Sequence, residues 1–324
     1  MSAWEPYAAA AVGPAAVWAL WRLQTVSVDV LRTRLLVLTR HWDQAWLYAI
    51  VSWFGTFLHE VSHATVLVLS GHGVKRFRAG IEEGHVLPGR MRGGVGMLFF
   101  LAAALAPLYI PPLLALLALW LVLGVLPDPF TVGGEGLAGV WDAVRLVLVE
   151  LPKDLLLAIA GLDLAQWRHA AVLAVVLLFA PGSRPSHVTT RFHSAGDGGD
   201  VPALRRHIRH HPLPFLLFLA AVYGAYWLTR WVPEAYWYPL EAAWAVAVAG
   251  IVLAVFGAAS WTLVGLDGRV MPGLAWLGPA AFVAVQVLGR MLEWPLGVIQ
   301  LNGVSVAAWL VVSLVLGAVL PRRR

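Results

Sequence analysis

Long apolar runs, separated by short polar or glycine-rich connections, make up most of this chain. Most of the runs match the roughly 20 residues that an α-helix needs to cross a bilayer. The pattern predicts an all-α, multispan transmembrane helical bundle of about seven or eight spans, depending on whether the first run crosses fully. The predicted spans cover residues 7–20, 45–70, 95–126, 155–180, 213–232, 240–266, 274–291 and 296–320.

A short extended segment is predicted directly after the second run. Gly71 and Gly73 end that run, as glycine commonly ends a helix. The stretch that follows is basic and punctuated by glycines. It predicts a short hairpin built from Val74–Arg78 and His85–Leu87.

Prolines interrupt the third predicted span. Pro107, Pro111 and Pro112 lie within an almost wholly apolar stretch from residue 95 to residue 126. Thirty-two residues are too few for two full crossings, so one long, broken span is predicted. The backbone groups that the prolines free need partners in the surrounding protein or in a wet cavity.

The spacing of polar segments divides the chain into four parts. Residues 1–43 join the first apolar run to an amphipathic segment that carries several arginines, and residues 44–181 form a membrane core. Residues 182–212 are a basic loop rich in histidine and glycine, and residues 213–324 form a C-terminal block of spans.

Composition supports a membrane protein and narrows its chemistry. Sixty per cent of the residues are hydrophobic and only 13% are charged, which is far from the balance of a soluble domain. The net charge of +5 suits an anionic lipid bilayer, and no nucleic-acid motif is present. The chain has no cysteine, so disulfides and thiolate zinc sites are excluded and any metal must bind nitrogen or oxygen. The sequence leaves the oligomeric state open.

An H-E-x-x-H pattern lies inside the second predicted span, at His59, Glu60 and His63. The two histidines are one helical turn apart, so both imidazoles project from one face and can bind one Zn²⁺. Glu60 lies beside them as a candidate general base. Ionisable groups deep in an apolar span are costly and usually functional, which favours a metal site over a packing role.

The residues around this pattern extend it. They read Phe57-Leu58-His59-Glu60-Val61-Ser62-His63-Ala64, and then Leu69-Ser70-Gly71-His72-Gly73-Val74-Lys75-Arg76-Phe77. In these residues the chain resembles the site-2 protease family of intramembrane zinc metalloproteases, over residues 45–126. The resemblance implies that His59 and His63 are zinc ligands and that Glu60 is the catalytic base.

The resemblance also implies a third zinc ligand, an aspartate from a later segment. Ser194 to Asp197 fits a Ser-x-x-Asp element of divergent family members, and a glycine-rich loop can fold back with little steric cost. Leu266-Asp267-Gly268 matches the family's Leu-Asp-Gly pattern but lacks the preceding Asn-Pro. Asp197 is favoured over Asp267 and Asp200.

Charge placement predicts the topology. Alternating spans put the basic stretches near 75–92 and 184–209 and the C-terminal arginines on one side, which is cytoplasmic by the positive-inside tendency. The segment 22–43 breaks this tendency in an eight-span count. His59 and His63 then lie roughly 10 to 17 Å below the cytoplasmic end of their helix, at 1.5 Å per residue.

These features predict an integral, multi-pass zinc endopeptidase whose active site is reached from the cytoplasmic side. Its substrate would be a transmembrane protein cleaved in or near its membrane segment. Two alternatives stay open: a non-hydrolytic zinc-binding transporter or sensor, and an inactive, protease-like scaffold.

Overall fold

The computed structural model describes residues 5–39, 45–81, 84–89, 93–124, 136–179, 208–210, 212–268 and 277–319. α-Helix accounts for 84% of these residues, which confirms a mostly helical fold. The helices are α1 Glu5–Thr39, α2 Ala45–Leu69, α3 Gly93–Leu123, α4 Gly136–Arg145, α5 Leu151–Ala160, α6 Trp167–Phe179, α8 Pro212–Leu228, α9 Glu234–Gly268, α10 Leu277–Met291 and α11 Val298–Val319. Two strands, β1 Val74–Ala79 and β2 Gly84–Pro88, follow α2.

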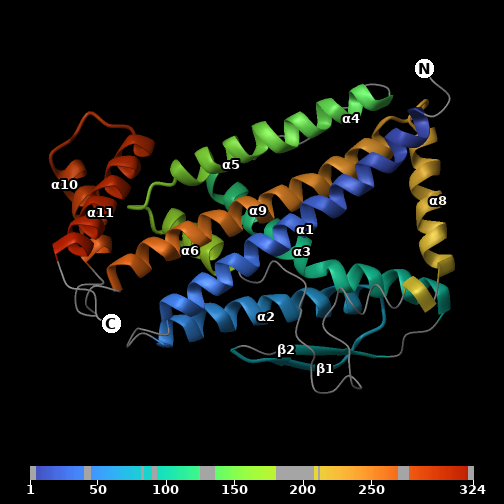
Figure 1. Cartoon of the computed structure of the whole chain (residues 1–324), viewed down its shortest axis with the longest axis horizontal. Helices are drawn as coiled ribbons and strands as arrows, with labels where there is room; N and C mark the ends of the chain where they lie inside the picture. The colour runs from blue at the N-terminus through green and yellow to red at the C-terminus, as the bar shows by residue number, and fades with distance from the viewer. Residues whose placement is uncertain are drawn as a thin grey trace.

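The long helices lie along one another. Figure 1 shows α1, α2, α9 and the α4–α5 segment running along the long axis, with α8 at one end and α10 and α11 at the other. α9 packs against α1 and α3 through a face rich in small residues, and 72% of its apolar window Glu234–Gly257 is buried. Small residues let helix backbones approach closely. At this contact, the indole N–H of Trp244 in α9 donates a 3.1 Å hydrogen bond to the Gly13 carbonyl of α1.

Three helical segments among the described residues are long and apolar enough to cross a membrane. They are Ala102–Leu123, Glu234–Gly257 and Val298–Leu316. Shorter apolar helices cover Trp167–Leu178, Phe215–Leu228 and Leu277–Met291. These segments are compatible with a membrane protein, and the count of seven or eight spans stays a prediction.

One predicted span is divided in the structure. The sequence predicted a single span from about residue 155 to residue 180, but α5 ends at Ala160 and α6 begins at Trp167. Asp163 holds the intervening turn, because its carboxylate accepts bonds from the Ala165 amide (3.2 Å) and the Gln166 side chain (3.0 Å). The sequence on both sides of this turn is apolar, so the two helices were predicted as one span.

Another predicted boundary is absent, and two neighbouring helices are continuous. The first apolar run and the following amphipathic segment form one 35-residue helix, α1. α4 continues into α5 through a five-residue π-helical stretch, Leu146–Glu150. Pro152 has no N–H for the Leu148 carbonyl, and the Leu151 amide bonds to Leu146, one residue farther back than in an α-helix.

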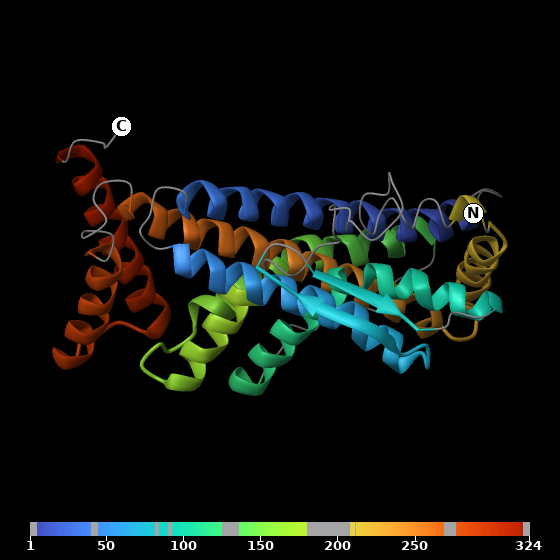
Figure 2. The ribbon, with the colours of Figure 1, turned by 90° about the horizontal axis from the view of Figure 1, so that it is seen from below.

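The predicted hairpin is confirmed. β1 and β2 pair antiparallel, with Phe77 opposite Val86 and Ala79 opposite Gly84. The hairpin lies along α2, as Figure 2 shows. Ser52 and Thr56 of α2 donate to the Ile81 carbonyl near its tip, at 2.6 and 3.3 Å.

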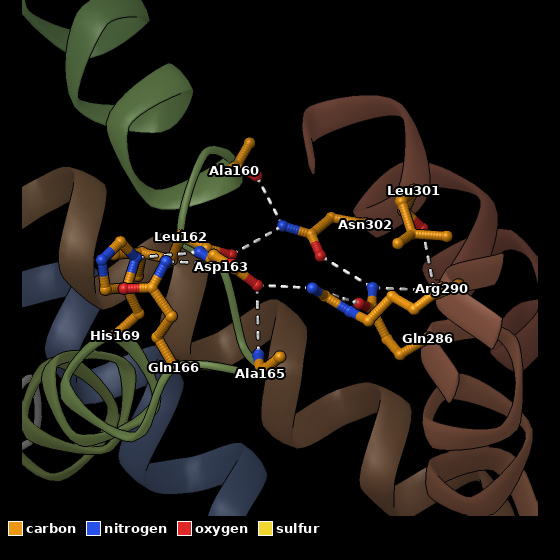
Figure 3. A network of polar contacts seen from close by, with 11 residues as sticks. Ala160, Leu162, Asp163, Ala165, Gln166, His169, Gln286, Arg290, Leu301 and Asn302 are labelled. Atoms are coloured by element: carbon orange, nitrogen blue, oxygen red, sulfur yellow. Dashed lines mark hydrogen bonds and ion pairs between the residues drawn. The ribbon is translucent and has the colours of Figure 1, made fainter. Parts of the chain in front are cut away.

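A polar network fastens α10 and α11 to the turn between α5 and α6 (Figure 3). The Asn302 amide donates to the Ala160 and Leu162 carbonyls at 2.7 and 2.9 Å. Gln286 donates to the Asn302 carbonyl oxygen at 2.8 Å, and Arg290 pairs with Asp163. Asn302 therefore joins α11 to α10 and to the end of α5 through side-chain hydrogen bonds.

Candidate metal centre

His59 and His63 lie one turn apart in α2 and converge. Their Nε2 atoms are 3.1 Å apart, and their rings meet edge to face with centroids 4.7 Å apart. His59 is only 7% exposed, and His63 is partly buried. The helix therefore brings together two imidazole nitrogens in a site largely shielded from solvent.

The second ring nitrogen of His63 is fixed by α3. His63 Nδ1 lies 2.7 Å from the Ala103 carbonyl oxygen. Because a carbonyl only accepts, Nδ1 must carry the proton, and in the neutral ring the Nε2 lone pair faces His59. Metal-binding histidines usually use their other nitrogen in this way.

The two nitrogens fit a zinc ion. Two imidazole nitrogens on one tetrahedral zinc, at about 2.0–2.1 Å each, lie about 3.3 Å apart. The observed 3.1 Å is close to that separation. Without a metal, the same geometry serves a hydrogen bond that His59 Nε2–H donates to His63.

Glu60 occupies a different stripe of α2. It shares this stripe with Ser52 and Thr56, four residues apart, and the three side chains meet the hairpin. Glu60 is 5% exposed and packs against Gly84 at the start of β2. A Cβ at position 84 would lie only 2.6 Å from Glu60 Oε1, so the strand backbone comes directly onto the carboxylate.

Aromatic side chains of α2 and β1 lie together where the hairpin meets α2. Trp53 and Phe57 stack with centroids 5.2 Å apart, and Phe57 meets Phe77 of β1 edge to face at 6.0 Å. All three are more than a third exposed. The stripe beside Glu60 therefore presents an apolar surface rather than a charged one.

The side chains of the three aspartates predicted as candidate third ligands are not placed by the described residues. Asp197 and Asp200 lie outside the described residues, and the side chain of Asp267 is not described. In the described ranges, no group of three histidines or carboxylates could hold a metal ion.

Two features of the site were not predicted from the sequence: the Ala103 carbonyl that fixes His63, and the contact between Gly84 and Glu60. The signal for the first was present in Pro107, four residues after Ala103, which removes the usual partner of that carbonyl. Gly84, in a short strand next to glutamates, carried a weaker signal for close backbone approach.

Comparisons with protein family models, with characterised proteins and with solved structures gave no match to this chain. The resemblance to site-2 proteases therefore depends on the residues of α2 and the hairpin that carry it.

Proposed function

We propose that this protein is an intramembrane zinc metalloendopeptidase of site-2 protease type. It hydrolyses peptide bonds in or near the transmembrane segments of other membrane proteins. The observation that supports this best is the convergence of the His59 and His63 Nε2 atoms to 3.1 Å on a largely buried face of α2, with a buried carboxylate next in sequence.

Each residue of the motif has a distinct task in this proposal. His59 and His63 would hold the ion through Nε2, with Asp197 as the proposed third ligand. A bound zinc supplies Lewis-acid chemistry: it polarises the scissile carbonyl and makes water acidic enough to ionise near neutral pH. Glu60 holds the proton from the attacking water and delivers it to the departing amine nitrogen.

Burial strengthens the role of Glu60. With 5% of its surface exposed, its charge is poorly screened by solvent, and Gly84 leaves it little room to move. A base held in one position lowers the cost of orienting it during proton transfer.

The substrate must offer an extended backbone, because a transmembrane helix satisfies its own hydrogen bonds. The β1–β2 sheet has two strands, and an unwound substrate segment can pair with it as an added strand. The contact between β2 and Glu60 supports this proposal, since it brings the sheet beside the catalytic base. Deleting the hairpin without loss of cleavage would contradict it.

The membrane setting belongs to the same proposal. The protein is multi-pass, with about seven or eight spans, and the site opens to the cytoplasmic side. The three long apolar helices and the apolar stripe beside Glu60 support it.

The test compares the wild type with two variants as purified full-length protein in detergent, with zinc content and cleavage of unfolded casein measured together. The wild type should contain about one zinc per chain and cleave. Glu60→Gln should keep the zinc and lose turnover, whereas His63→Gln should lose both.

The rival functions give different results. A zinc transporter or sensor would bind zinc through the histidines without any cleavage that depends on Glu60. Wild-type protein that takes up no zinc would mean that the 3.1 Å contact is a plain histidine pair, and the chain would be a scaffold.

A further inference from the structure

α3 contains three prolines, and each removes one backbone donor. Pro107, Pro111 and Pro112 lie inside the continuous helix from Gly93 to Leu123. A proline cannot donate to the carbonyl four residues earlier. The carbonyls of Ala103, Pro107 and Leu108 therefore lose their ordinary helical partners.

Side chains from two other helices replace two of the lost donors. His63 of α2 donates to the Ala103 carbonyl at 2.7 Å, and Gln24 of α1 donates to the Leu108 carbonyl at 3.0 Å. Ala103 and Leu108 are buried, so water is a poor alternative partner. Both bonds join distant segments at the point where α3 is interrupted.

We infer that Pro107 is a positioning residue of the metal centre. It keeps the Ala103 carbonyl available for His63 Nδ1–H, and this bond directs the Nε2 lone pair of His63 toward His59. The inference depends on the proposed zinc site. It adds that a carbonyl of α3, forty residues away in the sequence, sets the ring orientation and tautomer that His63 needs to bind zinc.

The physical reason is competition for one acceptor. With alanine at position 107, an N–H would lie in register with the Ala103 carbonyl, as in any α-helix. His63 would then share or lose its acceptor, and neither the ring orientation nor the Nδ1–H tautomer would be fixed. Loss of such a supporting partner typically weakens metal binding about 10- to 100-fold.

The chain supplies a matched control. Pro112→Ala also restores one backbone donor to α3, but toward Leu108, whose side-chain partner is Gln24 and not a candidate ligand. Both variants should fold, because alanine is a better helix former than proline. Thermal unfolding of the metal-free proteins checks this directly.

The experiment measures zinc affinity of the full-length protein by competition with a chromophoric chelator. Pro107→Ala should bind Zn²⁺ about 10- to 100-fold more weakly than wild type, and Pro112→Ala should match wild type. Nitrogen-15 NMR of histidine-labelled, metal-free protein gives a second measurement. The His63 signal, assigned by its loss in His63→Gln, should be the Nδ1–H tautomer in wild type and in Pro112→Ala but mixed in Pro107→Ala.

The outcomes separate this inference from the proposed function. Equal zinc affinity and an unchanged His63 tautomer in Pro107→Ala would overturn the role of Pro107 while leaving the zinc site intact. Equal weakening in both proline variants would show a general effect of straightening α3 and would also overturn it. If the wild type binds no zinc through His59 and His63, the proposed function fails, and the tautomer measurement still decides whether Pro107 fixes His63.

Discussion

Replacing Gly84 with alanine should disable Glu60, the proposed catalytic base, while leaving His59 and His63, the proposed metal ligands, untouched. The new Cβ would lie 2.5 Å from Glu60 Cγ and 2.8 Å from Cδ, against 3.4–4 Å for ordinary contact. Glu60 must therefore move by about 1 Å, and a misplacement of that size at a reacting group can cost about 100-fold in rate. The buried surroundings of Glu60 leave it little room to yield without cost. The expected result is a kcat about 100-fold lower.

The assay compares casein cleavage and zinc content of Gly84→Ala with those of wild type and of a matched glycine variant. Gly224→Ala is the control, because nothing lies within 4 Å of the Cβ it adds. Gly84→Ala should keep its zinc, since the His59 and His63 nitrogens lie on another stripe of α2. A kcat within threefold of wild type would refute the reasoning, and loss of zinc together with activity would show that Gly84 supports the fold instead.

Two further predictions concern how the helices are held together. Burial raises the pKa of Asp163, but the hydrogen bonds from Gln166, Arg290 and the Ala165 amide outweigh it and hold that pKa below its ordinary value of 3.8. The stability from this group is therefore present above pH 3.8 and lost as the pH falls below it. Spin-label distances between α5 and α11 should stay constant from about pH 5 to 8 and lengthen only as the pH falls below 3.8, and Asp163→Asn should abolish that change. Gln24→Leu should lower the free energy of unfolding by about 1–2 kcal/mol, because the buried Leu108 carbonyl loses its donor, and an unchanged thermal unfolding curve would contradict this.

The sequence predicted features that depend on neighbouring residues. The hairpin after α2 follows from local signals, namely the glycines at 71 and 73 and two short extended runs. The convergence of His59 and His63 follows from helical geometry alone, since residues four apart share a face. The mostly helical fold follows from the length of the apolar runs.

Features that depend on distant contacts could not be predicted in the same way. The turn at Asp163 is apolar enough on both sides to resemble one continuous span, and its hydrogen bonds include a pair with Arg290, 127 residues later. The contact of Gly84 with Glu60 requires the hairpin to lie on one stripe of α2, which no local pattern specifies. The proposed third ligand, Asp197, is followed by two glycines in the sequence, and glycine specifies no single local conformation.

The prolines of α3 destabilise that helix, but the carbonyls they leave without helical partners accept hydrogen bonds from α2 and α1. A proline inside a helix costs about 3 kcal/mol or more, and a buried carbonyl without a donor costs about 1–3 kcal/mol. The bonds from His63 and Gln24 remove the second cost at two positions, but they require α2 and α1 to lie against the interrupted part of α3. The interruption therefore selects one arrangement of three helices, because any register that moves His63 away from Ala103 leaves a buried carbonyl unpaired. Since the same bond orients a candidate zinc ligand, the proposed metal centre would require the same packing of α3.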